Sequence, residues 1–194
     1  MLFPLFIAGA LASVRVEKQI QVKPIRVVIA GLVHGHAGGF LRSALGRKEI
    51  EIVGIAEPQA DVRERYAKQF QIPSKMFFTN VTDMLKAVRP EVALIYSSTY
   101  DHKHIAIECA SNGVHVMMEK PLAVSLADAK DMQAAAKKFN VKMLVNYETT
   151  WYPNSALIEQ IAMKGMELGK IRKVTVRDGH QGPVEIGCQT EFLQ

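Results

Sequence analysis

The stretch GLVHGHAGGF, residues 31–40, follows directly on the apolar run IRVVIA, residues 25–30. An apolar run that ends in a glycine-rich turn before a helix is typical of a phosphate-binding turn. The fingerprint G-x-G-x-x-G expects glycine at 31, 33 and 36, and this chain has Gly31, Val33 and His36 there. The stretch is therefore either a phosphate cradle with two glycines replaced or a flexible turn between a strand and a helix.

Strand and helix patterns alternate along the rest of the chain. Apolar, β-branched runs typical of strands buried on both faces lie at residues 25–31, 50–57, 76–79, 92–98, 114–120 and 142–148. Helical periodicity appears between them, at residues 36–46, 59–70, 81–88, 102–111 and 125–138. Asn80 before Asp83 and Ser125 before Asp128 are helix-start signals. The alternation predicts an α/β fold, a doubly wound parallel sheet with helices on both faces.

Composition excludes several classes of protein. The chain has 194 residues, of which 48% are hydrophobic and 22% charged, so an ordinary globular fold is expected. Its net charge of +5 comes from scattered basic residues without a nucleic-acid recognition motif, which indicates a solvated surface and no nucleic-acid partner. Cys109 and Cys188 have neither a metal-site spacing nor a disulfide framework, and no metal is expected. Cys109 is predicted to be buried in a helix.

The first twelve residues, MLFPLFIAGALA, differ from the rest. They carry no charged side chain and end in Ala10-Leu11-Ala12, which has the A-x-A form of a signal-peptidase site. The run is too short to span a bilayer as a helix. A basic segment before the apolar run is missing, so the alternative is a simple extension of a cytoplasmic protein. We favour a secretory signal, and with it a periplasmic or secreted location.

An acidic residue follows the second predicted strand. In doubly wound sheets, ligands bind beyond the carboxyl ends of the strands, next to the first strand. Glu57 lies at such an end, where a carboxylate accepts hydrogen bonds from adenosine ribose hydroxyls and repels a 2′-phosphate. The alternative is a solvated strand-end residue. Together with the glycine-rich turn, Glu57 favours a nicotinamide dinucleotide as cofactor, and NAD over NADP.

The segment from Ser97 to Met132 resembles the Gfo/Idh/MocA family of oxidoreductases, which includes glucose–fructose oxidoreductase and inositol dehydrogenases. The shared features are a small polar strand end, a histidine at the next helix start, a glycine before the next strand, and then Glu-Lys-Pro. Here these are Ser97-Ser98-Thr99, His104, Gly113 and Glu119-Lys120-Pro121. NYETTWYP, residues 146–153, resembles a later polar and aromatic segment of the family. The resemblance runs from about residue 25 to residue 178.

The resemblance implies hydride transfer between NAD and a secondary alcohol of a sugar or cyclitol. Two alternatives stay open: NAD-dependent glycoside cleavage, which begins with the same hydride step, and a non-catalytic dinucleotide-binding module. Lys120 is the expected catalytic residue, since it can hydrogen-bond the oxygen of a developing carbonyl. The bond before Pro121 is a candidate for the cis form.

The resemblance also assigns binding residues. The expected cofactor-binding residues are Gly31, Val33, His34, Gly35, His36, Glu57, Ser97, Ser98, Thr99, His104, Glu119, Lys120 and Asn146. Trp151 and Tyr152 are expected to contact the substrate. Gly38 and Gly39 are expected to ease packing of the first helix against the sheet.

The resemblance divides the chain into three parts. Residues 1–12 are the signal segment, residues 25–150 the Rossmann dinucleotide-binding domain, and residues 151–194 the start of an α+β substrate domain. In that last part a helix at 155–167 and the first strand of an antiparallel sheet at 169–183 are expected. The family's catalytic histidine segment would lie beyond Gln194, so we expect a truncated substrate domain that is inactive alone. The complete protein is expected to be a homo-oligomer.

Overall fold

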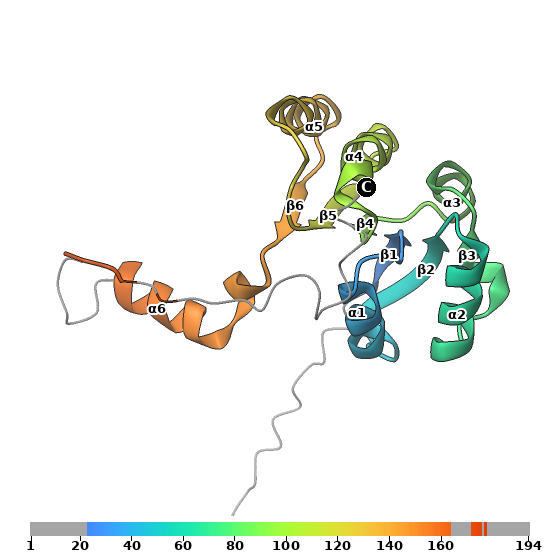
Figure 1. Cartoon of the computed structure of the whole chain (residues 1–194), viewed down its shortest axis with the longest axis horizontal. Coiled ribbons are helices and arrows are strands. Elements are labelled where there is room, and N and C mark those ends of the chain that lie inside the picture. Colours follow the sequence, from blue (N-terminus) through green and yellow to red (C-terminus); the bar gives the residue numbers. More distant parts are fainter. Residues whose placement is uncertain (1–22, 164–171, 176, 178–194) are drawn as a thin grey trace, which may run out of the picture.

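The computed structural model describes residues 23–163, 172–175 and 177. Six strands form one sheet in the order β3-β2-β1-β4-β5-β6, and every neighbouring pair is parallel (Figure 1). The strands are β1 Ile25–Ala30, β2 Ile50–Ala56, β3 Phe77–Phe78, β4 Val92–Ile95, β5 His115–Glu119 and β6 Met143–Asn146. The strand order reverses between β1 and β4, which places the switch point of the sheet there. The predicted doubly wound fold is confirmed.

Six α-helices connect or follow these strands. They are α1 His36–Ala44, α2 Ala60–Phe70, α3 Val81–Val88, α4 His102–Ser111, α5 Leu126–Phe139 and α6 Pro153–Met163. Both predicted start signals are confirmed: the Asn80 side chain accepts the Asp83 amide at 2.8 Å, and Ser125 accepts the Asp128 amide at 3.1 Å. Each cap satisfies an amide that the first turn of a helix leaves without an intrahelical partner.

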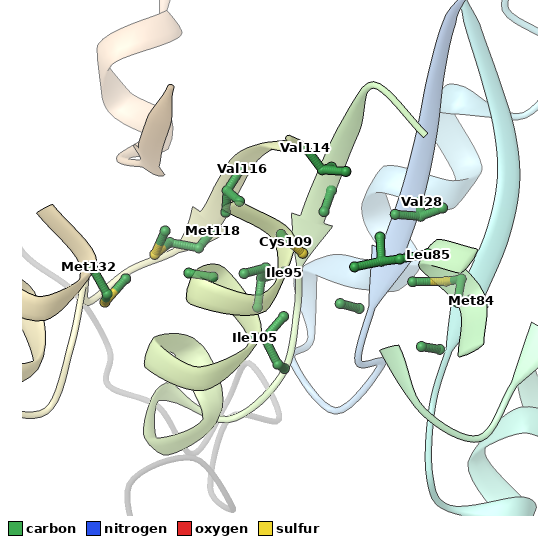
Figure 2. Close-up of a cluster of buried hydrophobic side chains, with 14 residues drawn as sticks. Val28, Met84, Leu85, Ile95, Ile105, Cys109, Val114, Val116, Met118 and Met132 are labelled. Carbon is green, nitrogen blue, oxygen red and sulfur yellow. The ribbon is translucent and has the colours of Figure 1, made fainter. Parts of the chain in front are cut away.

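The sheet is buried on both faces. Helices α1 and α2 cover one face, and α3, α4 and α5 cover the other (Figure 1). Adjacent residues of β1 point to opposite faces, so Val28 packs among α3 and α4 while Ile29 packs under α1 and α2. Figure 2 shows Cys109 among the apolar side chains on the Val28 side. Burial raises the pKa of the Cys109 thiol to about 12, which fits its predicted packing role.

The segment after β6 leads away from the sheet (Figure 1). It begins with a 3₁₀ helix at Glu148–Trp151 and continues as α6, which confirms the expected helix as far as Met163. Residues 172–175 and 177 are the described part of the expected strand at 169–183, and they form no strand. The rest of that stretch and the signal segment, residues 1–12, lie outside the described residues. No helix in the described ranges is long and apolar enough to cross a membrane.

Candidate functional site

The glycine-rich turn depends on Gly31 for a steric reason. Gly31 has φ +84°, a conformation that residues with a side chain rarely adopt. A Cβ atom there would lie 2.6 Å from both the backbone N and the Cα of Ser97 at the end of β4. The backbone of the turn therefore passes directly against the end of β4, as only glycine permits. Gly35, by contrast, has helical φ −55° and ψ −28°.

The expected role of Gly38 and Gly39 is wrong. Gly38 faces α2, where a Cβ would lie 3.7 Å from the Tyr66 hydroxyl, an ordinary contact distance. A Cβ at Gly39 would meet nothing within 4 Å. Neither position needs glycine for α1 to pack against its neighbours.

Glu57 is buried at the carboxyl end of β2, and each of its carboxylate oxygens accepts one backbone amide. Its side chain is 1% exposed, so the alternative of a solvated strand-end residue is wrong. Oε2 accepts the Leu32 amide at 2.8 Å, and Oε1 accepts the Gln59 amide at 2.9 Å. Glu57 thereby fastens the glycine-rich turn to the start of α2. Each carboxylate oxygen has a second lone pair for another donor.

A cleft of about 340 Å³ opens beside this carboxylate, at the carboxyl ends of β1, β2, β3 and β4. Of the predicted cofactor residues it is lined by Gly31, Val33, Glu57, Ser97, Ser98 and His104. Residues 79–82, the turn after β3 and the start of α3, also line it and were missed from the sequence. The Asn80 helix-start signal lies in this turn and could have pointed to it, because a turn between β3 and a helix comes at the same edge of the sheet.

A second group of predicted residues gathers away from the cleft lining, around the carboxylate of Glu119. This Glu119 cluster consists of His34, His36, Glu119 and Asn146. His36 Nδ1 lies 3.2 Å from Glu119 Oε2, and His34 Nε2 lies 3.9 Å from the same oxygen. Asn146 Nδ2 donates to Glu119 Oε1 at 2.8 Å. The cluster joins the turn after β1 to the ends of β5 and β6.

Burial and charge fix the protonation of the Glu119 cluster. Burial alone would raise the pKa of Glu119, but hydrogen bonds from His36 and Asn146 and the neighbouring histidines lower it below its ordinary value. Burial lowers the pKa of His34 to about 4, although the negative charge of Glu119 acts in the opposite direction. At neutral pH, Glu119 is therefore ionised and His34 is neutral. The His36 amide donates to His34 Nδ1 at 3.1 Å, so the His34 proton is on Nε2.

Lys120 follows β5 and precedes a cis peptide bond to Pro121, as considered from the sequence. The segment after it is held by His102, which is 1% exposed. His102 Nδ1 lies 3.1 Å from the Pro121 carbonyl and 3.3 Å from the Leu122 carbonyl. Because both partners are acceptors, Nδ1 carries the proton. Burial lowers the pKa of His102 although these two carbonyls act in the opposite direction, so the ring is neutral.

His102 was missed from the sequence, where His104 was chosen in its place. Helix α4 begins at His102, and His104 is an exposed residue 3.9 Å from Asp101 at the edge of the cleft. The spacing of apolar residues along α4 could have identified His102 as the buried histidine. Position 102 shares the buried face of α4 with Ile105, Ala106 and Cys109, at the i, i+3, i+4 and i+7 spacing.

The remaining predicted residues lie apart from both groups. Thr99 is buried in a 3₁₀ helix at Thr99–Asp101 and is absent from the lining of the cleft. Trp151 is 63% exposed and Tyr152 is 45% exposed, in the segment that leaves the sheet after β6 (Figure 1). Their contact with a substrate stays a prediction.

Comparisons with known proteins agree with this architecture. A family described as oxidoreductases with an NAD-binding Rossmann fold matches residues 25–147. The mouse trans-1,2-dihydrobenzene-1,2-diol dehydrogenase is 26% identical over 146 residues, covering 75% of this chain and 43% of that protein. The glucose-6-phosphate 3-dehydrogenase of Bacillus subtilis is 31% identical over 146 residues, covering 72% of this chain and 39% of that protein.

A solved structure with the same fold is the myo-inositol 2-dehydrogenase of Lactobacillus plantarum. It superposes with a TM-score of 0.66 at 20% identity, covering 77% of this chain and 43% of that chain. The present chain thus spans less than half the length of the relatives it matches.

Proposed function

Because this chain belongs to the Gfo/Idh/MocA family of oxidoreductases with an NAD-binding Rossmann fold, we propose that it binds a nicotinamide dinucleotide in the cleft beside Glu57. The complete protein would transfer hydride to or from a secondary alcohol of a sugar or cyclitol. The observation that carries the proposal is the turn at Gly31, where a Cβ would collide with the backbone of Ser97. Such a side-chain-free turn lets a phosphate group approach the backbone closely.

The residues present fit the parts of the cofactor. The first turn of α1 offers amide groups and a positive dipole end to the pyrophosphate. The free lone pairs of the Glu57 carboxylate can accept the hydroxyls of the adenosine ribose. Ser97 and Ser98 line the same cleft from the end of β4. The nicotinamide ring, when bound, supplies the hydride acceptor or donor.

Lys120 is proposed to act on the oxygen of the substrate. In the oxidation, the substrate carbon would give a hydride to NAD⁺, and the hydroxyl proton would pass to a base, for which the family resemblance implies a histidine beyond Gln194; the products are a ketone and NADH. The Lys120 ammonium can donate a hydrogen bond to that oxygen as the carbonyl forms. Lys120 directly follows β5 and is steadied through the next two carbonyls by His102. No feature of the named relatives, all dehydrogenases, supports the glycoside-cleaving alternative.

The choice of NAD over NADP is proposed on the charge of Glu57, which disfavours a 2′-phosphate. One opposing charge lies close by, since the Arg63 guanidinium donates to the carbonyls of Glu57 at 2.6 Å and Pro58 at 2.8 Å. Arg63 is engaged with the backbone in this way, whereas the carboxylate of Glu57 is part of the cleft lining. We therefore expect the negative charge of Glu57 to outweigh the positive charge of Arg63 and to favour NAD over NADP.

Titration of the chain with NADH and NADPH, followed by nicotinamide fluorescence, tests both proposals. We expect saturable binding of NADH that is tighter than that of NADPH, and a smaller preference in Glu57→Gln. Glu49→Gln is the matched control, because it removes an exposed carboxylate just before the amino end of β2. Absence of saturable binding of either dinucleotide would contradict the cofactor proposal, and tighter NADPH binding would contradict the role of Glu57.

Export is proposed on the uncharged start of the chain and its Ala10-Leu11-Ala12 site alone. Amino-terminal sequencing of the protein from its native cells tests it. A mature protein that begins at Ser13 is expected, and retention of Met1 in the cytoplasm would contradict it.

A further inference from the structure

Two buried or half-buried imidazoles and one buried carboxylate converge at the turn after β1. One ligand atom from each of His34, His36 and Glu119 lies within 4.8 Å of the others. We propose that these three side chains form a binding site for a divalent transition-metal ion of the Zn²⁺ class. The site shares the turn after β1 with the cleft beside Glu57, but none of its three residues lines that cleft, and it does not depend on the cofactor proposal.

The distances are close to those of a coordinated ion. Zinc bonds to imidazole nitrogen and carboxylate oxygen are about 2.0–2.2 Å long, which separates neighbouring ligand atoms in a tetrahedral site by about 3.4 Å. Glu119 Oε2 lies 3.2 Å from His36 Nδ1 and 3.9 Å from His34 Nε2. Small rotations of the side chains would therefore bring all three atoms onto one ion.

The type of ligand selects the type of ion. Imidazole nitrogens suit zinc and its neighbours in the first transition row, whereas magnesium and calcium prefer sites made of oxygen atoms alone. Two histidines and one carboxylate leave a further coordination position open for water or another small ligand. His36 side-chain atoms are 32% exposed, which provides a path for the ion, while His34 and Glu119 are 1% exposed.

The surroundings of the carboxylate favour coordination. Asn146 donates to Glu119 Oε1 and so orients the carboxylate with Oε2 directed at the histidines. A hydrogen bond to the second oxygen of a ligating carboxylate is a common support of metal sites.

Three costs accompany binding. Coordination through His36 Nδ1 displaces the proton that this nitrogen donates to Glu119. Coordination through His34 Nε2 requires the proton to move to Nδ1, so the His36 amide must give up its bond with that nitrogen. This amide belongs to the first turn of α1, where water or an anion can accept it. The positive charge of Lys120 acts on His34 and opposes a cation. The single negative charge of Glu119 therefore gives a site of moderate affinity.

Metal binding is tested on the tag-free chain, stripped with a chelator and titrated with Zn²⁺ by calorimetry and with Co²⁺ by visible absorption. We expect one equivalent of either ion and a Co²⁺ spectrum typical of four or five ligands. His36→Gly restores the glycine of the fingerprint at a half-exposed position, and Glu119→Gln keeps the shape of the side chain. Each substitution should weaken binding by about tenfold or more.

His104→Asn is the matched control, since it removes an exposed histidine from the edge of the other cleft and should leave Zn²⁺ affinity unchanged. Circular dichroism of every variant checks that the fold is kept. The proposal is overturned if neither ion binds, or if His36→Gly binds Zn²⁺ as tightly as the parent chain. The second result would also reveal an ion held elsewhere, for example by His180 or Cys188.

Discussion

The cleft beside Glu57 and the Glu119 cluster share the ten-residue stretch 31–40 and use it in different ways. Gly31 lines the cleft, whose shape is set by the backbone conformation of this residue and by the Leu32 amide bound to Glu57. His34 and His36, a few residues further, turn toward Glu119, where side chains that gain and lose protons make the contacts. The difference shows that the two residues replacing fingerprint glycines take different roles: Val33 lines the cleft, whereas His36 contacts Glu119.

The largest effect is expected at Gly31, where the cleft depends on backbone shape. Gly31→Ala should destabilise the fold by about 2–5 kcal/mol, from left-handed strain of roughly 1–2 kcal/mol and a clash with Ser97 of roughly 1–3 kcal/mol. Urea denaturation measures the change. Gly39→Ala is the control in the same stretch and should stabilise by about 0.5–1 kcal/mol, since it replaces an exposed helical glycine with open space around it. Similar stability of both variants would contradict the importance given to the Gly31 turn.

Substitution of Lys120 should slow the chemical step while leaving cofactor binding nearly unchanged. In protein that carries whatever residues follow Gln194 in its gene, Lys120→Ala should lower the turnover number by about 10²–10³-fold, as loss of one transition-state donor does. The dissociation constant for NADH should change far less, because the adenosine side of the cleft is intact. Steady-state rates and fluorescence titration measure the two effects. An unchanged turnover number would assign Lys120 to structure alone.

Stability should depend on pH through the Glu119 cluster and not through the backbone of the cleft. In the unfolded chain His34 has its ordinary pKa of 6.5, whereas in the folded chain burial lowers this pKa to about 4. Stability is therefore greatest above pH 6.5 and falls as the pH is lowered toward 4, by about 3 kcal/mol from this residue. The lowered pKa values of His102 and Glu119 act in the same direction.

Denaturation midpoints between pH 7 and pH 4 measure this loss in the parent chain and in His34→Gln. The variant should show a clearly smaller decline in stability over that range. His104→Gln, a change at an exposed histidine, should leave the decline as it is. An equal decline in all three proteins would show that His34 is not the group responsible.

The smallest effect is expected at Ser125, a helix cap that belongs to neither the cleft nor the Glu119 cluster. Ser125→Ala removes the cap of α5 and should cost about 1 kcal/mol at every pH from 7 to 4. NADH affinity and Zn²⁺ affinity should both be unchanged. Thermal unfolding and the two titrations check this. A change in either affinity would indicate that ligand binding depends on the overall stability of the fold and not only on the residues of each site.

The fold and the cleft could be predicted from the sequence because their signals are local. Apolar runs and helical periodicity placed all six strands and the helices between them, and Gly31 and Glu57 follow directly from their positions after β1 and β2. Helix caps at Asn80 and Ser125 are likewise patterns of four residues. Each of these features is decided within a few residues of chain.

The Glu119 cluster could not be predicted in the same way, because its contacts cross the sheet. Strand β4 lies between β1 and β5, so the meeting of His36 with Glu119 depends on strand order as well as on side-chain direction. The burial of His102 rather than His104 depends on which side of α4 faces the sheet. The error at Gly38 and Gly39 has the same origin, since the space around a helix is set by its neighbours and not by its own sequence.

The turn after β1 is held from two sides by two carboxylates, Glu57 at Leu32 and Glu119 at His36. A shift of this segment toward one carboxylate would alter its contact with the other, so ligands bound on the two sides would be thermodynamically linked. Linkage is reciprocal: if an ion at the Glu119 cluster changes the affinity for a dinucleotide by some factor, the dinucleotide changes the affinity for the ion by the same factor. The short span between Leu32 and His36 is thus the place where cooperativity between the two sites would arise.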